Sequence, residues 1–369
     1  MEISRFNLFT QKLASTGLET IILNPGPSLA YLIGVHFFIF ERPIVAFFSA
    51  GTKPALVLPE LEIPKAETAS IDMQLFPYQD NPATWGAAFQ QAAQYLGWAG
   101  EKRRTVGVEA DRLRLLEIRL IEAALPGVRF GDASLLADLR MHKDEKEIAC
   151  MRKAIAFAET GLAASLPLIK IGMTEKELSA EIGFQTQRAG SEIPSNPMVE
   201  SGPNSANPHA TVSDRKLSPG DLLVIDFGAG YQGYFADITR TFAVGEVETE
   251  FSHIVEVTWA ANAAGRSAAR PGIPAGEVDK AARGVIERAG YGPYFTHRTG
   301  HGLGSESHEE PYIYAENTLI LEPGMVFTVE PGIYLPRRAG ARVEDDVLIT
   351  PSGSESLSSL PRELVRVGS

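Results

Sequence analysis

Residues 222–242 read LLVIDFGAGYQGYFADITRTF, and this stretch decides the fold of the second half of the chain. Two apolar runs lie on either side of a Gly-rich turn, a pattern that predicts a β-hairpin. Each run carries an acid: Asp226 ends the first, and Asp237 lies inside the second. Paired positions on neighbouring strands are about 5 Å apart, so we expect the two carboxylates to face each other across the hairpin.

Two further apolar segments carry acids in a similar way. Glu330 closes the apolar run of GMVFTVEPGIYL (324–335), and Glu344 opens the run of ARVEDDVLIT (341–350). Any one of these acids is readily explained as a solvated turn residue, although Asp237 lies in the middle of its strand. The four acids together are harder to explain as solvated turn residues. Ionised carboxylates in a low-dielectric interior are costly unless they are paired or bind metal. The four acids therefore predict a cation site.

The segment TGHGLG (299–304) adds a nitrogen donor, His301, between glycines that permit close backbone approach. Four carboxylates and one imidazole suit two divalent cations with shared carboxylates better than one tetrahedral zinc. A water that bridges two such cations becomes a hydroxide nucleophile, which is chemistry for amide hydrolysis. Three more histidines of this half lie in Gly-, Pro- or Ser-rich segments and are candidates for substrate contact or proton transfer: His209, His297 and His308.

Composition excludes several partners. The chain has 369 residues, is 44% hydrophobic, and carries a net charge of −12, which repels nucleic acid and anionic membrane surfaces. The most apolar stretch (35–51) is interrupted by Glu41 and Arg42 and is too short to span a bilayer. The N-terminus lacks the pattern of an export signal. A single cysteine, Cys150, cannot form an internal disulfide, which fits a reducing cytoplasm.

The pattern along the chain predicts two domains. Short apolar runs alternate with helical patterns over the first part of the chain, as in an α/β unit. Charge density then rises, and Lys143 and Asp144 precede a long helical pattern. We therefore expect domains at 1–140 and 141–369. The second domain is also mixed α/β (α+β), with helix pairs followed by strand pairs.

Four motifs, in this order and spacing, resemble the pita-bread metallopeptidases in the branch of prolidases (Xaa-Pro dipeptidases) and aminopeptidases P: VIDFGAGYQGYFADITRTF, TGHGLG, VEPGIY and RVEDDVLIT. SGPNSANPHA (201–210) resembles the histidine segment of that branch. The resemblance is specific from about residue 144 to residue 350. It implies a small N-terminal creatinase-like α/β domain, a C-terminal pita-bread domain, a homodimer, and a small peptide substrate with proline at the second position.

The resemblance also implies roles for the candidate residues. Asp226 would chelate one metal ion, Asp237 and Glu344 would bridge two, and the ions would be Mn²⁺, Co²⁺ or Zn²⁺. His301 and Glu330 would complete the coordination of the second ion. The full set of implied metal ligands is therefore Asp226, Asp237, His301, Glu330 and Glu344.

The implied catalytic and substrate-binding residues overlap with this set. His209 and His308 would polarise the substrate or stabilise the tetrahedral intermediate, and His297 would line the pocket. Glu330 would assist proton transfer. Arg342 would orient acidic neighbours or meet a substrate carboxylate, a task that suits its forked guanidinium. The polar segment 305–307 departs from the family's usual aspartate and aliphatic residue, and this departure bears on specificity rather than on metal binding.

Other classes fit the sequence less well. Asp226, Phe227 and Gly228 also spell the magnesium-binding tripeptide of protein kinases, but the other kinase motifs are missing, and so is the G-x-S-x-G elbow of a serine hydrolase. A methionine aminopeptidase typically lacks such an N-terminal domain. A creatinase-like amidinohydrolase or an inert pita-bread module for protein binding would lose metal ligands. Size favours a dipeptidase over an aminopeptidase P, and both stay open.

Overall fold

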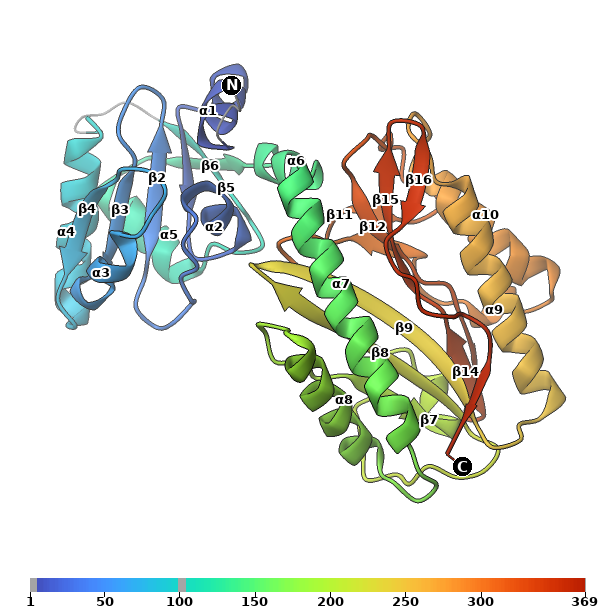
Figure 1. Ribbon diagram of the computed structural model, residues 1–369. Coiled ribbons are helices and arrows are strands. Elements are labelled where there is room, and N and C mark those ends of the chain that lie inside the picture. The colour runs from blue at the N-terminus through green and yellow to red at the C-terminus, as the bar shows by residue number, and fades with distance from the viewer. Residues whose placement is uncertain (1–4, 99–103, 369) are drawn as a thin grey trace. The chain divides into compact units, whose positions relative to one another are not determined.

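The computed structural model describes residues 5–98 and 104–368 (Figure 1). The N-terminal segment that was expected to lack an export signal begins with residues 1–4, which lie outside the described residues. The described chain forms two compact units, whose boundary in the sequence falls between Arg140 and Met141. None of the helices in this described part has the length and apolar character that a bilayer crossing needs.

The N-terminal unit is built on a six-stranded mixed sheet with strand order β4-β3-β2-β1-β5-β6. Ile21 and Ile22, neighbours on β1, belong to different core clusters, so helices cover both faces of this sheet. The strands are β1 (Thr20–Leu23), β2 (Val45–Ser49), β3 (Ala55–Pro59), β4 (Gln74–Tyr78), β5 (Thr105–Val108) and β6 (Arg129–Asp132). The helices are α1 (Arg5–Ser15), α2 (Pro27–Ile33), α3 (Ile63–Ala66), α4 (Pro82–Tyr95), α5 (Leu115–Ala124) and α6 (Leu135–Met141).

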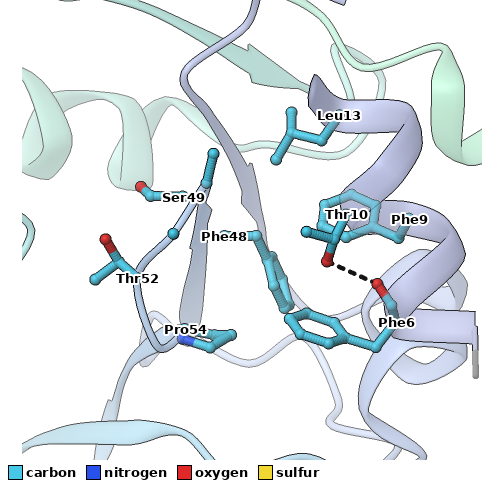
Figure 2. A pocket seen from close by; sticks show the side chains of 10 residues that line it. Phe6, Phe9, Thr10, Leu13, Phe48, Ser49, Thr52 and Pro54 are labelled. Carbon is cyan, nitrogen blue, oxygen red and sulfur yellow. Dashed lines mark hydrogen bonds between the residues drawn. The ribbon is translucent and has the colours of Figure 1, made fainter. Parts of the chain in front are cut away.

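A pocket of about 200 Å³ lies in this unit, between α1 and the turn from β2 to β3 (Figure 2). Phe9 and Phe48 meet there edge to face, with ring centroids 5.5 Å apart. Its described lining residues are apolar or neutral, so this pocket offers no acid, base or metal ligand. The charged chemistry lies in the C-terminal unit.

The quoted stretch forms the predicted hairpin, with β8 (Leu222–Tyr231) antiparallel to β9 (Tyr234–Val244). Its register differs from the expectation: Asp226 pairs with Thr239, and Asp237 pairs with Gly228. The two carboxylates are therefore diagonal neighbours on one face, not a directly opposed pair. The two-residue turn at Gln232 (φ 48°) and Gly233 (φ 79°) sets this register, as in type I′ hairpins.

The hairpin belongs to a four-stranded sheet with strand order β17-β9-β8-β7. Helices α7 (Glu145–Ser165) and α8 (Glu175–Ala189) pack against this sheet (Figure 1). A five-stranded sheet (β11-β10-β12-β15-β16) and the ribbon β13-β14 complete the unit, with α9 (Thr249–Ala268) and α10 (Gly276–Arg288) packed against their strands. The remaining strands are β7 (Met198–Ser201), β10 (Gly300–Gly302), β11 (Glu309–Ile313), β12 (Val326–Val329), β13 (Gly332–Leu335), β14 (Ala339–Arg342), β15 (Asp345–Thr350), β16 (Gly353–Ser356) and β17 (Val365–Val367).

The two apolar segments 324–335 and 341–350, with their flanking residues, are each divided between two strands, as expected from Glu330 closing one apolar run and Glu344 opening another. β12 gives way to β13 at Glu330 and Pro331, and β14 gives way to β15 at Val343 and Glu344. β12 pairs with β15 while β13 pairs with β14, so both segments change sheets at the same level. Pro331 has no N–H to donate to a ladder, which favours a break there. The breaks release Glu330 and Glu344 from regular strand geometry.

A buried ion cluster ties β15 to its neighbours. Asp345 is fully buried and contacts three guanidinium groups: Arg240 at 2.8 Å, Arg266 at 3.3 Å and Arg362 at 2.6 Å. These arginines come from β9, from α9 and from the segment that precedes β17. Asp345 therefore joins elements that are distant in sequence.

We expect Asp345→Ala to lower the free energy of unfolding by about 3–5 kcal/mol, because it leaves three guanidinium groups without their shared buried partner. Urea unfolding of the metal-free protein measures this loss without a contribution from bound metal. Glu355→Ala is the matched control, since Glu355 pairs with Arg152 at 2.7 Å on the surface. It should cost less than about 1 kcal/mol, and equal losses in the two variants would contradict the role given to the buried cluster.

Candidate metal centre

The hairpin and the strand breaks bring the predicted acids together. One oxygen each from Asp226, Asp237 and Glu344 forms a group whose atoms all lie within 4.8 Å of one another. Donor atoms of His301, Glu330 and Glu344 form a second group within the same limit. Glu344 belongs to both groups, and a third group joins Asp237, His301 and His308, so these side chains form one continuous set of possible metal donors.

Burial makes three of these acids, Asp237, Glu330 and Glu344, hard to ionise without a cation. Loss of solvent, and then the charge of Asp226, raise the pKa of Glu330 to about 8. Loss of solvent and neighbouring carboxylates also raise the pKa of Asp237 and Glu344 well above the ordinary range. Divalent cations would offset both effects, and this set of carboxylates with one imidazole matches the donors that such ions take. The residues present therefore fit a divalent metal centre.

His301 is held with one ring nitrogen directed at the acids. Its Nδ1 lies 3.1 Å from the carbonyl oxygen of Gly302, and because a carbonyl only accepts, Nδ1 must donate. Nε2 then keeps its lone pair and lies 3.4 Å from Glu330 Oε1 and 4.0 Å from Asp237 Oδ2. Burial lowers the pKa of His301 to about 3, so the ring is neutral. This is the arrangement of a metal-ligating histidine with a fixed tautomer.

The glycines beside His301 serve close packing, as their position suggested. A Cβ on Gly300 would lie 1.9 Å from the carbonyl oxygen of Thr328, and a Cβ on Gly302 would lie 2.2 Å from that of Glu310. Only glycine therefore lets β10 fit between β11 and β12. Asp279 of α10 accepts from the hydroxyl of the preceding Thr299 at 2.7 Å, which anchors the start of this strand.

Several polar residues that were not predicted hold the acids in place. Thr239 donates to Glu344 Oε2 at 2.6 Å, Thr328 donates to Glu330 Oε1 at 3.4 Å, and Asp346 Oδ2 accepts from the backbone N–H of Asp237 at 3.2 Å. Thr239 and Thr328 each lie two positions from a predicted acid, on the same strand face by alternation. This two-residue spacing from a predicted acid is the feature of the sequence by which these two threonines could have been found.

Arg342, Tyr334 and His297 form a hydrogen-bonded chain beside the acids. Arg342 donates to Asp226 Oδ2 at 2.6 Å and to the Tyr334 hydroxyl at 2.9 Å. His297 Nδ1 donates to the carbonyl oxygen of Arg298 at 2.7 Å, so its Nε2 accepts from Tyr334 at 2.8 Å. Burial lowers the pKa of His297 to about 4, which fits this neutral state. Of the two roles expected for Arg342, the contacts favour orienting an acidic neighbour.

These residues surround one cavity of about 300 Å³. His209 and His308 reach it from exposed loop positions, and the rings of His308 and His301 lie 3.8 Å apart. All nine predicted site residues line this cavity: His209, Asp226, Asp237, His297, His301, His308, Glu330, Arg342 and Glu344. Three lining residues were not predicted, namely Met198, Pro208 and Arg298.

Glu200, one strand position from the end of β7, is another buried acid that was not predicted. It is fully buried, and its Oε1 accepts from the backbone N–H of Ala210, next to His209, at 3.0 Å. Its Oε2 has no hydrogen-bond partner among the residues that the structure describes. Burial raises the pKa of Glu200 to about 8. The loop that carries His209 is thus attached to the sheet through a carboxyl group.

We expect the metal-free protein to lose stability as the pH rises from about pH 6.5 to about pH 8, with no further loss from Glu330 above its folded-state pKa. A folded-state pKa near 8 for Glu330 means that the folded chain binds more protons than the unfolded chain in this window, so deprotonation favours unfolding. The lowered pKa values of His297 and His301 act in the opposite direction, but only below about pH 6.5, where unfolded imidazoles take up protons.

Thermal unfolding after chelation, recorded across this range, measures the effect. Saturating Mn²⁺ should flatten the pH dependence, because the carboxylates then bind a cation as ions. Glu330→Gln should reduce the slope of the metal-free protein. Identical slopes with and without metal would contradict this account.

Comparison with known proteins extends across both units. Residues 149–351 match metallopeptidase family M24, and residues 5–142 match the creatinase/prolidase N-terminal domain. The chain is 37% identical over 367 residues to the "Probable dipeptidase PepE" of Mycobacterium tuberculosis, across 98% of this chain and 96% of that protein. It is 33% identical over 353 residues to the Xaa-Pro dipeptidase of Pyrococcus horikoshii, across 94% and 95%.

A solved structure extends the match to three dimensions. The prolidase of Thermococcus sibiricus superposes with a TM-score of 0.92 at 31% identity, over 100% of both chains. The predicted fold, an N-terminal creatinase-like α/β domain followed by a pita-bread domain, is thus confirmed, and so is the resemblance drawn from the four motifs. The family match implies a divalent metal and peptidase chemistry. The chain belongs to metallopeptidase family M24.

Proposed function

We propose that this protein is an Xaa-Pro dipeptidase that uses two divalent cations to hydrolyse the bond before proline. The observation that carries the proposal is the sharing of Glu344 between two donor groups, each compact enough for one cation. The names of the relatives from Pyrococcus horikoshii and Thermococcus sibiricus support the choice of substrate. We further propose Mn²⁺, Co²⁺ or Zn²⁺ as the ions, a cytoplasmic homodimer as the working form, and a boundary between its domains at residue 141.

The proposed ligands divide between the two cations. Asp226 would hold the first, His301 and Glu330 would hold the second, and Asp237 and Glu344 would be shared by both. Cations in such a site lower the pKa of water toward neutrality and polarise a carbonyl oxygen. Arg342 orients Asp226 through their 2.6 Å contact. Thr239 does the same for Glu344 at 2.6 Å by occupying one of its oxygens.

Protein side chains would handle the protons of the reaction. Hydrolysis adds one water: its oxygen bonds to the carbonyl carbon of the first residue, the C–N bond breaks, and a proton ends on the proline nitrogen. Glu330, a carboxyl group in the cavity, would take the proton from water and return it to the leaving nitrogen. His209 and His308, which line the cavity, would donate to the carbonyl oxygen as it gains charge.

The cavity size favours a dipeptide over a longer peptide. About 300 Å³ is at the small end of ligand pockets, which run from about 300 to 1,000 Å³. An aminopeptidase P acting on longer peptides is the second candidate, because the fold and metal site are shared. The two candidates therefore have to be distinguished by comparing a dipeptide with a longer peptide as substrates.

We expect hydrolysis of Ala-Pro to be lost after chelation and restored by Mn²⁺, Co²⁺ or Zn²⁺, because the acids alone cannot activate water at neutral pH. Metal analysis of the purified protein should give close to two ions per chain. The tripeptide Ala-Pro-Ala serves as the comparison substrate and should be cleaved more slowly. Faster cleavage of the tripeptide would favour the aminopeptidase, and no activity on either substrate with any of the metals would refute the proposal.

A second test concerns His308. His308→Ala should lower kcat by roughly a hundredfold or more, the effect of losing a general acid or base, while metal content stays unchanged. His142→Ala is a suitable control, since His142 pairs with Glu322 outside the cavity and should leave kcat unaltered. Loss of metal in the His308 variant would reassign this residue as a ligand, because its ring also groups with Asp237 and His301.

A further inference from the structure

We propose that Glu200 is a positioning residue for catalysis, because its carboxyl group holds the loop (202–213) that places His209 against the substrate carbonyl. This inference rests on the proposed function, in which His209 donates to the carbonyl oxygen as it gains charge. Glu200 is fully buried and is not among the described residues that line the cavity. It therefore acts through His209 and does not touch the substrate.

Strand pairing places Glu200 behind the wall of the cavity. Met198 pairs with Asp226, and Glu200 pairs with Val224, across β7 and β8. Side chains alternate along a strand, so Glu200 shares the sheet face of Met198 and Asp226, which both line the cavity. Glu200 is thus on the catalytic face of the sheet, covered by the loop that follows β7.

His209 depends on the backbone of this loop for its position. Its ring forms no hydrogen bond with another residue in the described part of the chain. Its backbone N–H donates within the loop, to Asn207 Oδ1 at 3.3 Å. The attachment of the loop tip therefore decides where the imidazole lies.

The loop tip, residues 207–210, has few attachments to the rest of the unit. Among the described residues, two hydrogen bonds join it to residues outside the loop. Ala210 N–H donates to Glu200 Oε1 at 3.0 Å, and Arg342 Nη1 donates to the carbonyl oxygen of Pro208 at 3.4 Å. The bond to Glu200 is the shorter of the two, so Glu200 is the main anchor of the tip.

The base of the same loop is held by another buried carboxylate, Glu175 of α8. Its Oε1 accepts from the Ser201 hydroxyl at 2.7 Å, and its Oε2 accepts from the Ser213 hydroxyl at 2.7 Å. Both oxygens of Glu175 are thus satisfied, and both ends of the loop are fixed. Glu200 completes this arrangement at the tip, where His209 lies.

A purely structural role does not explain Glu200. Its Oε2 is buried without a hydrogen-bond partner in the described part of the chain, and an unpaired buried polar atom costs stability. An apolar side chain of similar size would avoid this cost, and Ala210 N–H would still donate to the carbonyl oxygen of Asn207 at 3.2 Å. Violations of this kind are expected at functional sites.

The carboxyl group of Glu200 is neutral near pH 7, because burial raises its pKa to about 8. A neutral acid accepts a hydrogen bond at Oε1 without placing another negative charge near Asp226. Glutamine is also neutral and offers the same acceptor, so it is the conservative replacement.

The test measures hydrolysis of Ala-Pro by the metal-loaded enzyme at neutral pH. Glu200→Met removes the acceptor at similar volume. We expect kcat to fall about 10- to 100-fold with KM nearly unchanged, because a displaced His209 stabilises the transition state less. Glu200→Gln should keep kcat within about twofold of the wild type, since its amide oxygen still accepts from Ala210. Metal content should be unchanged in both variants.

Thermal unfolding separates this role from a structural one. Glu200→Met should unfold at or above the wild-type temperature, because it removes the unpaired buried oxygen. Val199→Ala is the matched control, since Val199 is fully buried in the core on the opposite face of β7. It should lower the unfolding temperature and leave kcat unchanged.

A double-mutant cycle shows whether Glu200 acts through His209. In a His209→Ala background, Glu200→Met should lower kcat by less than about twofold, because the group that it positions is gone. Glu200→Ala, which also lacks the acceptor, replaces Glu200→Met in this cycle should the latter not fold.

Several results would overturn the assignment: wild-type kcat without the acceptor, a loss in Glu200→Gln as large as that in Glu200→Met, lost metal, or losses that multiply in the double variant. Failure of the proposed function looks different, because the wild-type enzyme itself would then cleave neither Ala-Pro nor Ala-Pro-Ala with any of the metals.

Discussion

The gathering of four buried or partly buried carboxylates around one cavity is the constraint on which the C-terminal unit depends. For Asp237, Glu330 and Glu344, loss of solvent and repulsion between neighbouring carboxylates raise the pKa, so ionisation of these three is unfavourable unless positive charge or donors are supplied. The surrounding protein supplies part of this compensation through Arg342, Thr239 and Thr328. Divalent cations would supply the rest, so a metallopeptidase site and stable packing of the two sheets that carry it are compatible.

The run of three acids at 344–346 shows how the fold separates charges that the sequence places together. Glu344 faces the candidate metal centre, Asp345 contacts three arginines, and Asp346 accepts from the backbone of Asp237. Strand alternation and the break before β15 send neighbouring side chains in different directions. Positive charge is divided in a similar way. One set of arginines surrounds Asp345, whereas Arg342 and Arg298 line the cavity.

Much of the site was predictable because metal chemistry demands unusual residues in apolar strands. An acid such as Asp237 in the middle of an apolar run is costly to bury unless it binds a cation, and all nine predicted residues line one cavity. Residues whose role depends on a neighbour were not predictable in the same way. Glu200 carries no motif of its own, and its importance follows from the loop that it contacts.

The sequence by itself determined the hairpin, the mixed α/β architecture of both halves and the identity of the acids and histidines, because periodicity and residue chemistry are local properties. The diagonal register of Asp226 and Asp237 is also a local property, because the two-residue turn at Gln232 and Gly233 sets it. Tertiary structure alone decided the change of sheet at Glu330 and Glu344, which brings these acids to the hairpin. Such placement depends on contacts between segments about a hundred residues apart, and no local pattern of side chains encodes a distance of that kind.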